Sequence, residues 1–358
     1  MTNNNGINQQ KAEAFAKRMM GVLNEGALAL MSSIGHRTGL FDTMSVIPPA
    51  TSGQIAEAAG LQERYVREWL GAMVVSRVVE FDPETKTYCL PEEHAAFLTR
   101  AATPDNLAMF TQYIPLLGTI EDDIVDCFHK GGGVPYSKFP RFQEVMAEDS
   151  GQTVAAALVE SILPLVPGLV EKLQVGLDVL DVGCGQGRAV NLMGRAFPNS
   201  RFTGYDFSEA GVAAARAEAE QMGLTNVRFE AKDVATIKAV EQYDLITAFD
   251  VIHDQAHPDR VLANIYAALK PDSTFLMQDI ASSSHVHKNM DLPLGPLLYT
   301  VSTMHCMTVS LAQNGQGLGT MWGREKALEM LAEAGFTEVD VHQLPHDFQN
   351  DYYVSTKQ

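Results

Sequence analysis

The chain has 358 residues, 46% of them hydrophobic, which is enough for a substantial core and excludes a disordered protein. The formal net charge of -18 opposes binding to nucleic acid, and the 4 cysteines include no close pair of the kind found in disulfide frameworks. The sequence also lacks a signal-peptide pattern and an apolar run that could span a bilayer, so we expect a cytoplasmic protein without a membrane partner.

The chain divides into three stretches. Residues 13–104 show helical patterns with one short strand pair, and residues 105–173 are helical apart from an interruption at residues 131–135. Over residues 174–358, strand patterns alternate with helical patterns, which predicts a parallel sheet with crossover helices. The expected fold class is therefore α/β, preceded by a mainly helical region.

The first stretch has the pattern of a winged helix-turn-helix. Thr51 can cap a helix over residues 54–59, and the two strands of a wing are expected at residues 78–81 and 87–90. A second helix begins near Glu63 and is expected to place three large side chains on one apolar face: Tyr65, Trp69 and Met73.

A winged helix-turn-helix can bind DNA, or it can serve as a dimerisation and substrate-covering module. Residues 20–105 contain six Lys and Arg but eleven Asp and Glu, and the second helix carries Glu63 and Glu68 beside Arg64 and Arg67. A DNA-binding surface needs several uncompensated cations to neutralise phosphates. The sequence therefore favours the second role and disfavours a nucleic-acid partner.

A strand followed by a glycine-rich turn opens the third stretch. Residues 178–182 are mostly apolar and rich in β-formers, the turn Gly183-Cys184-Gly185-Gln186-Gly187 follows, and a helical pattern begins after it. Glycines at such a turn let the backbone bend sharply and let a ligand approach closely. A glycine cluster alone is weak evidence, so its setting has to decide what it binds.

Acidic residues stand at the ends of the strands that follow this turn. Asp206 ends a strand over residues 202–206, where a carboxylate can accept both hydroxyls of a ribose. Asp233 ends the next predicted strand and can accept an adenine amino group, and Asp250 ends the one after it. Because open α/β sheets bind ligands at the carboxyl ends of their strands, these positions predict a nucleoside-containing cofactor.

Asp181 separates two classes of such cofactors. A dinucleotide fingerprint has the spacing Gly-x-Gly-x-x-Gly and holds a pyrophosphate at a helix N-terminus, whereas this turn has the spacing Gly-x-Gly-x-Gly. Asp181 lies two residues before the turn, and its carboxylate favours a positively charged amino acid group. This position indicates the methionine end of S-adenosylmethionine.

The residues from Asp178 onward resemble the class I methyltransferases. Residues 179–187 look like the first motif of that family, and Asp206 looks like its ribose-binding acid. The winged-helix region is similar to that of small-molecule O-methyltransferases, and also to that of a bacterial subgroup often labelled transcriptional regulators. Signatures of that subgroup resemble residues 131–136, 304–311 and 317–323, and the closing strands of the sheet, the last one antiparallel, resemble residues 336–342 and 352–356.

The resemblance implies a Rossmann-like, seven-stranded methyltransferase sheet in a catalytic domain over residues 174–358. It further implies a winged-helix dimerisation domain at 13–104, a helical linker or substrate lid at 105–173, and a homodimer. The cofactor would be S-adenosyl-L-methionine, the product S-adenosyl-L-homocysteine, and the methyl acceptor a small molecule. Residues 139–146 look like a helix that lies over the cofactor, so the expected cofactor-binding residues are Asp181, Gly183, Cys184, Gly185, Gly187, Asp206, Phe207, Asp233, Val234, Phe249, Asp250 and Met146.

Residues 251–254 resemble the segment that carries the general-base histidine of plant-type O-methyltransferases. His253 matches that base, and Asp279 matches the acid that positions it, so both are expected catalytic residues. A histidine that only packs or caps at a strand-helix turn would fit the sequence equally well. Where the family places a further acid beside the base, this chain has Trp322-Gly323-Arg324.

The methyl acceptor is not identified by the sequence. Its expected contacts are Tyr113, Tyr136, His305 and Trp322, although ordinary core packing explains such residues about as well. No metal is expected, since His285 and His287 lack a neighbouring acid or cysteine that would complete a site. Two functions stay open: O-methylation of a small molecule with His253 as base, and a winged-helix transcriptional regulator that binds S-adenosylmethionine.

Overall fold

The computed structural model describes residues 7–358. The chain forms two compact units, Met1–Gly118 and Thr119–Gln358, so the boundary falls inside the stretch from 105 to 173 that the sequence presents as one. Among the described residues, none of the helices has both the length and the apolar character needed to cross a bilayer.

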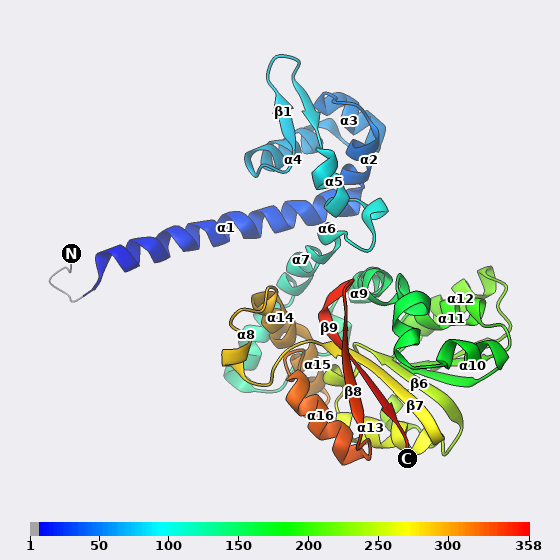
Figure 1. The fold of residues 1–358 in the computed structure, drawn as a ribbon. Coiled ribbons are helices and arrows are strands. Elements are labelled where there is room, and N and C mark those ends of the chain that lie inside the picture. The colour runs from blue at the N-terminus through cyan, green and yellow to red at the C-terminus, as the bar shows by residue number, and fades with distance from the viewer. Residues whose placement is uncertain (1–6) are drawn as a thin grey trace. The chain divides into compact units, whose positions relative to one another are not determined.

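The first unit is helical with one two-stranded sheet (Figure 1). The capping box of Thr51 and Gln54 at the start of α3 and the antiparallel wing of β1 and β2 confirm the winged helix-turn-helix. The elements are α1 Gln9–Thr38, α2 Leu40–Val46, α3 Ser52–Ala59, α4 Glu63–Val75, β1 Glu80–Asp82, β2 Thr87–Cys89, α5 Glu92–Leu98, α6 Leu107–Phe110 and α7 Tyr113–Gly118.

The prediction for the apolar face of α4 is wrong at one residue. Tyr65 is 80% exposed, whereas the side chains that α4 buries are Val66, Trp69, Leu70 and Met73. Neighbouring residues on a helix are rotated by about 100°, so Tyr65 points away from the face that holds Val66.

The second unit is a seven-stranded sheet with helices on both faces (Figure 1). The strand order is β5-β4-β3-β6-β7-β9-β8, in which β9 alone runs antiparallel to its neighbours, as predicted for the last strand. The strands are β3 Asp178–Val182, β4 Arg201–Asp206, β5 Val227–Ala231, β6 Tyr243–Phe249, β7 Leu269–Ile280, β8 Val339–Leu344 and β9 Asp347–Thr356. The helices are α8 Glu121–Lys130, α9 Phe142–Ser150, α10 Leu169–Val175, α11 Arg188–Ala196, α12 Glu209–Gln221, α13 Pro258–Ala268, α14 Gly295–Val301, α15 Met307–Ala312 and α16 Gly323–Ala334.

Alternate residues of the central strands belong to two different hydrophobic cores. Val179 and Leu245 pack in one core, with apolar residues of α10, α11 and α12. Their neighbours Leu180 and Ile246 pack in the other core, with residues of α13 and α16. A parallel sheet buried on both faces leaves only its strand ends open for ligands.

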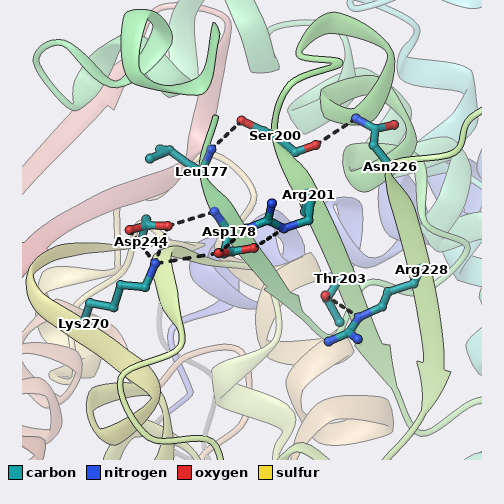
Figure 2. A network of polar contacts seen from close by, with 9 residues as sticks. All are labelled: Leu177, Asp178, Ser200, Arg201, Thr203, Asn226, Arg228, Asp244 and Lys270. Carbon is teal, nitrogen blue, oxygen red and sulfur yellow. Dashed lines mark hydrogen bonds and ion pairs between the residues drawn. The ribbon is translucent and has the colours of Figure 1, made fainter. Parts of the chain in front are cut away.

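Charged side chains hold the amino ends of these strands together (Figure 2). The Nε and Nη2 atoms of Arg201 donate to the two carboxylate oxygens of Asp178, each at 2.7 Å, and Lys270 donates to Asp244 at 2.8 and 2.9 Å. The hydrogen bonds and charge of Arg201 lower the pKa of Asp178 despite its partial burial. This network fixes the end of the sheet opposite the acids that the sequence predicts as ligands.

Two of the sequence signatures lie against each other in the second unit. A Cβ atom at Gly133 would come within 1.9 Å of the Thr308 carbonyl oxygen, so only glycine allows this close approach. The amide nitrogen of Val134 donates to the Thr308 hydroxyl at 2.8 Å. Gly133, the last glycine of the run at 131–133, is therefore required for packing against α15.

Candidate active site

A cavity of about 260 Å³ opens where β3, β4, β5 and β6 end. Every cofactor-binding residue that the sequence predicts lines this cavity, except Gly187. The aromatic ring of Tyr136 and the α9 side chains of Gln143 and Met146 form another part of its wall. The predicted cofactor residues therefore come together in one place although they follow four separate strands.

The glycines of the turn play different roles. Gly183 and Gly185 have φ angles of +71° and +52°, which lie in the left-handed region that favours glycine. A Cβ atom at Gly185 would meet nothing closer than the Gln143 side chain at 4.0 Å, so this residue leaves room in the cavity. A Cβ atom at Gly187 would lie 2.5 Å from Ala215 and 2.7 Å from Phe229, which shows that Gly187 is required for packing in the core rather than at the cavity surface.

Asp206 lies at the end of β4 and shapes the turn. One carboxylate oxygen accepts from the Gly185 amide at 2.9 Å, and the other accepts from the Ser208 amide at 2.8 Å. Burial raises the pKa of Asp206, against the effect of these two hydrogen bonds. Each carboxylate oxygen can accept more than one hydrogen bond, so the group can also take a pair of ligand hydroxyls.

Asp233 is displaced from its predicted position. β5 ends at Ala231, and Asp233 instead caps the 3₁₀ turn Val234–Thr236 by accepting from the Ala235 amide at 2.8 Å. Asp233 still lines the cavity.

Asp181 is the most deeply buried acid of the cavity, with 3% of its surface exposed. Its carboxylate accepts from the Thr247 hydroxyl at 2.6 Å. Burial is the main cause that raises its pKa to about 7, the Thr247 hydrogen bond lowers it, and the charge of Asp206 raises it further. A cation bound beside Asp181 would stabilise its ionised form.

This burial predicts a pH-dependent affinity for a cationic ligand. Below the pKa of about 7, Asp181 is protonated and its attraction for an ammonium group is lost, so S-adenosylmethionine should bind more weakly as pH falls through that value. Isothermal titration calorimetry on either side of this pH measures the change. Asp181→Asn should bind weakly at every pH, and it should stabilise the free protein above the pKa because it removes a buried charge. A wild-type affinity that does not change with pH would contradict this role.

His253, Asp279 and Trp322 form a buried group beside the cavity. His253 lies on the 3₁₀ turn Ile252–Asp254 that follows β6, and its Nδ1 atom lies 2.9 Å from Asp279 Oδ1. The Trp322 indole donates to the same oxygen at 3.0 Å. Burial lowers the pKa of His253, but the negative charge of Asp279 and the contact with Cys306 together raise it well above its usual value.

The four expected acceptor contacts lie in different environments. Tyr136 lines the cavity, and its hydroxyl accepts from the Gln143 amide at 2.7 Å. Trp322 is 5% exposed and is directed at Asp279, so the structure does not bring it to the cavity wall. Tyr113 is a buried residue of the first unit, and its contact with an acceptor stays a prediction.

His305 lies behind the aromatic wall of the cavity. It belongs to the π-helical turn Ser302–Cys306, and its ring stacks on Phe142 with centroids 3.6 Å apart. Burial, with a smaller effect of the His253 charge, lowers its pKa to about 3, so its ring is neutral. The packing interpretation of His305 is therefore the better supported of the two that the sequence left open.

Several cavity residues were not predicted. Asp254 is the neighbour of His253 in the same sequence segment, and the others come from α9, from the end of α15 and from the segments that follow the strands: Gln143, Arg188, Lys232, Gln255, His257 and Gln313. Their types are common on any surface, so only Asp254 had a signal in the sequence, namely its place in the motif of residues 251–254.

Within residues 7–358, one group of side chains has the composition of a metal site, namely Asp250, His253 and Asp279, whose ligand-type atoms lie within 4.8 Å of one another. His253 Nδ1 lies 3.8 Å from Asp250 and 2.9 Å from Asp279. A metal would need this nitrogen without its proton, whereas the raised pKa of His253 keeps the proton there. We interpret the group as an ion pair.

Two family models match separate parts of the chain. Residues 26–100 match the Rv2258c-like winged HTH domain, and residues 173–335 match a methyltransferase domain. Among curated relatives, the trans-aconitate 2-methyltransferase of Variovorax paradoxus is 34% identical over 101 residues, which are 28% of this chain and 37% of that protein. The chain spans less than half of the length of the curated relatives it matches.

Solved structures match nearly the whole chain. A candidate O-methyltransferase from Nostoc punctiforme has a TM-score of 0.72 at 19% identity, covering 95% of this chain and 98% of that one. Human N-acetylserotonin methyltransferase in complex with SAM has a TM-score of 0.70 at 17% identity, covering 96% and 97% of the two chains. At these identities the similarity establishes the shared fold.

Proposed function

We propose that this chain, which joins a winged helix-turn-helix domain to a methyltransferase domain of the S-adenosylmethionine-dependent class, methylates a small molecule on an oxygen atom. One observation carries the proposal. Asp181, Gly185, Asp206 and Asp233 line a single cavity, in the order along the sheet that suits the amino acid, ribose and adenine parts of S-adenosylmethionine. The apolar side chains of the same cavity suit a flat adenine ring: Met146, Phe207, Val234 and Phe249.

When bound, S-adenosylmethionine supplies a methyl group on a positively charged sulfur, which a nucleophile can displace in line. Asp181 would hold the ammonium group, Asp206 the ribose hydroxyls and Asp233 the adenine amino group, each by charge or hydrogen bonding. Tyr136 and α9 cover the cavity, which limits the access of water to the reacting atoms. An acceptor hydroxyl must also lose its proton, and the resemblance implies that His253 receives it.

The test is a coupled assay for S-adenosylhomocysteine with the purified chain, S-adenosylmethionine, and panels of phenols, alcohols, thiols and amines. We expect product with at least one hydroxyl compound and none in an Asp206→Ala variant. Turnover confined to thiols or amines would overturn the oxygen assignment. Absence of both turnover and cofactor binding would overturn the enzymatic assignment.

We also propose that the protein forms a homodimer through its first unit. The first two thirds of α1 expose a row of large apolar side chains at helical spacing, including Phe15 at 61%, Met19 at 43% and Leu23 at 74%. Such a row on a soluble protein marks a surface for a partner, and a second copy would cover it symmetrically.

Light scattering after gel filtration tests the dimer. The wild type should elute with twice the chain mass, and Met19→Glu with Leu23→Glu should convert it to a monomer by placing charges in the interface. Lys17→Glu, which changes an exposed polar residue on the same helix, serves as the matched control. A monomeric wild type would contradict the proposal.

A transcriptional regulator is the alternative function. On α4, Arg64 pairs with Glu68, and Arg67 lies 3.3 Å from Glu63, so the cations nearest a would-be recognition surface are already neutralised. This observation favours the enzyme over the regulator. Retention of the protein on DNA at low salt, lost as salt rises, would favour the regulator.

A further inference from the structure

We infer that Asp254, rather than its neighbour His253, is the catalytic residue that accepts the proton of the methyl acceptor. The inference rests on the proposed function, and it assigns a role that the resemblance gives to a different side chain. Both residues lie on the 3₁₀ turn Ile252–Asp254, and they differ in what their side chains face.

His253 is enclosed by protein on every side. Its side chain is 3% exposed, and it does not line the cavity. Nδ1 lies 2.9 Å from Asp279 Oδ1, and Cys306 is a further neighbour that raises the pKa of the ring. The segment after α15 closes over the turn, because the Gly319 amide donates to the His253 carbonyl at 3.1 Å and the Thr320 hydroxyl donates to Cys306 Sγ at 3.0 Å. The ring is therefore enclosed by protein and does not reach the cavity in which an acceptor would bind.

The charges that surround His253 also oppose its use as a base. The negative charges of Asp279 and Asp250 lie 2.9 and 3.8 Å from Nδ1. Asp279 and Cys306 raise the pKa of the ring well above its usual value in spite of burial, which favours the imidazolium form. An imidazolium has no free lone pair with which to take a proton.

Asp254, by contrast, lines the cavity together with Asp250, Tyr136 and Gln255. Its side chain is partly exposed, and one carboxylate oxygen accepts a hydrogen bond from the side-chain amide of Gln255 at 3.1 Å. The acids predicted to hold the amino acid, ribose and adenine are other residues, so Asp254 is a carboxylate of the cavity without a cofactor role.

The surroundings of Asp254 give its carboxyl group a pKa that suits a general base at neutral pH. Burial is the main cause that raises its pKa to about 7, the positive charge of His253 lowers it, and the charge of Asp250 raises it. The other groups that face it or share its cavity are Asp206, Tyr136, Gln255, Lys232 and His257. A base whose pKa lies near the working pH combines an ionised fraction with enough basicity to take a proton.

In the reaction, the acceptor oxygen forms a bond to the methyl carbon as the carbon–sulfur bond breaks. The electron pair of that bond goes to sulfur, which becomes a neutral thioether, and the O–H proton goes to the Asp254 carboxylate. His253, held by Asp279, is a positioning residue that keeps a positive charge behind this carboxylate. No oxidant, metal or further reactant is needed.

Asp254→Asn tests the assignment, because Asn keeps the shape and can still accept from Gln255. With the acceptor that turns over fastest in the panel, kcat should fall by about 100-fold or more, while the cofactor dissociation constant changes by less than about threefold. The wild-type kcat should rise with pH to a plateau with a midpoint near the pKa of about 7. Asp254→Glu should restore part of the activity, and Asp340→Asn, which removes an exposed carboxylate on β8, should behave as the wild type.

A second measurement does not depend on turnover. Carboxyl-carbon NMR of aspartate-labelled protein should contain a resonance that titrates near neutral pH and is absent from Asp254→Asn, whereas the resonance of Asp181, whose pKa is also about 7, should remain in that variant. The His253 ring should stay protonated through the same range. If no wild-type turnover is found, the proposed function fails, and this titration still decides the state of Asp254. A neutral His253 ring with an Asp254 that titrates in the usual acidic range would overturn the inference, as would an Asp254→Asn variant of undiminished kcat.

Discussion

An Asp206→Ala variant is expected to bind S-adenosylmethionine at least about 100-fold more weakly than the wild type. Two ribose hydroxyls would lose a charged acceptor, and hydrogen bonds to charged groups contribute roughly 1.5–3 kcal/mol each. The substitution also removes the acceptor for the Gly185 and Ser208 amides, so the turn that leaves room for the ligand loses its support. Isothermal titration calorimetry measures the affinity directly.

Asp206→Asn separates these two effects. The amide oxygen of Asn can replace only one of the two carboxylate oxygens, so we expect an affinity between those of the wild type and Asp206→Ala. Circular dichroism and the melting temperature show whether the variants remain folded. An Asp206→Ala protein that stays folded and binds with unchanged affinity would remove Asp206 from the cofactor site.

The second large effect is expected for Asp279→Ala, which should lower the free energy of unfolding of the second unit by about 3–5 kcal/mol. Asp279 is fully buried, and one of its oxygens accepts from His253, from the Trp322 indole and from the Ile280 amide. Its removal leaves a buried imidazolium without its nearest partner. Thermal or urea unfolding followed by circular dichroism measures the loss.

The pH dependence of this loss identifies its cause. The folded state raises the pKa of His253 above its unfolded value of 6.5, so the ion pair contributes its full stability below that value and loses it as pH rises through the folded pKa. The difference in stability between the wild type and Asp279→Ala should therefore shrink at alkaline pH. Asp126→Ala provides a matched control, because it removes the carboxylate of an exposed ion pair with Lys130, which is worth at most about 1 kcal/mol. A difference for Asp279→Ala as small as that control would show that the pair is not needed for stability.

Several features could be predicted because they depend on short stretches of chain. The cap at Thr51, the wing, the strand Asp178–Val182 and the glycine turn were all predicted within a few residues of their positions. Capping, turn formation and the alternation of apolar residues are properties of neighbouring residues, so one sequence can reveal them. The gathering of the acids at one site could also be predicted, because the carboxyl ends of parallel strands lie at one edge of the sheet.

Other predictions failed or changed because they depend on residues that are distant in the chain. Gly187 looked like a ligand-approach glycine, but Ala215 and Phe229 are what exclude a side chain there. The sequence predicts Trp322 as an aromatic contact for the acceptor, but its indole donates a hydrogen bond to Asp279. The O-methyltransferases that the sequence resembles have an acid in the segment that is Trp322-Gly323-Arg324 in this chain. In each case the contacting residue lies far away in the sequence, so no local pattern predicts the contact.

The amino-acid sequence is sufficient to predict a winged helix-turn-helix followed by a methyltransferase sheet, and the acids that follow its strands. The folded structure is needed to show which side chain of the turn at Ile252–Asp254 meets the cavity. In a 3₁₀ turn, successive side chains are rotated by about 120°, so His253 and Asp254 face different surroundings. Their roles are then set by burial and by the charges of Asp279 and Asp250, which the fold brings to one side of that turn.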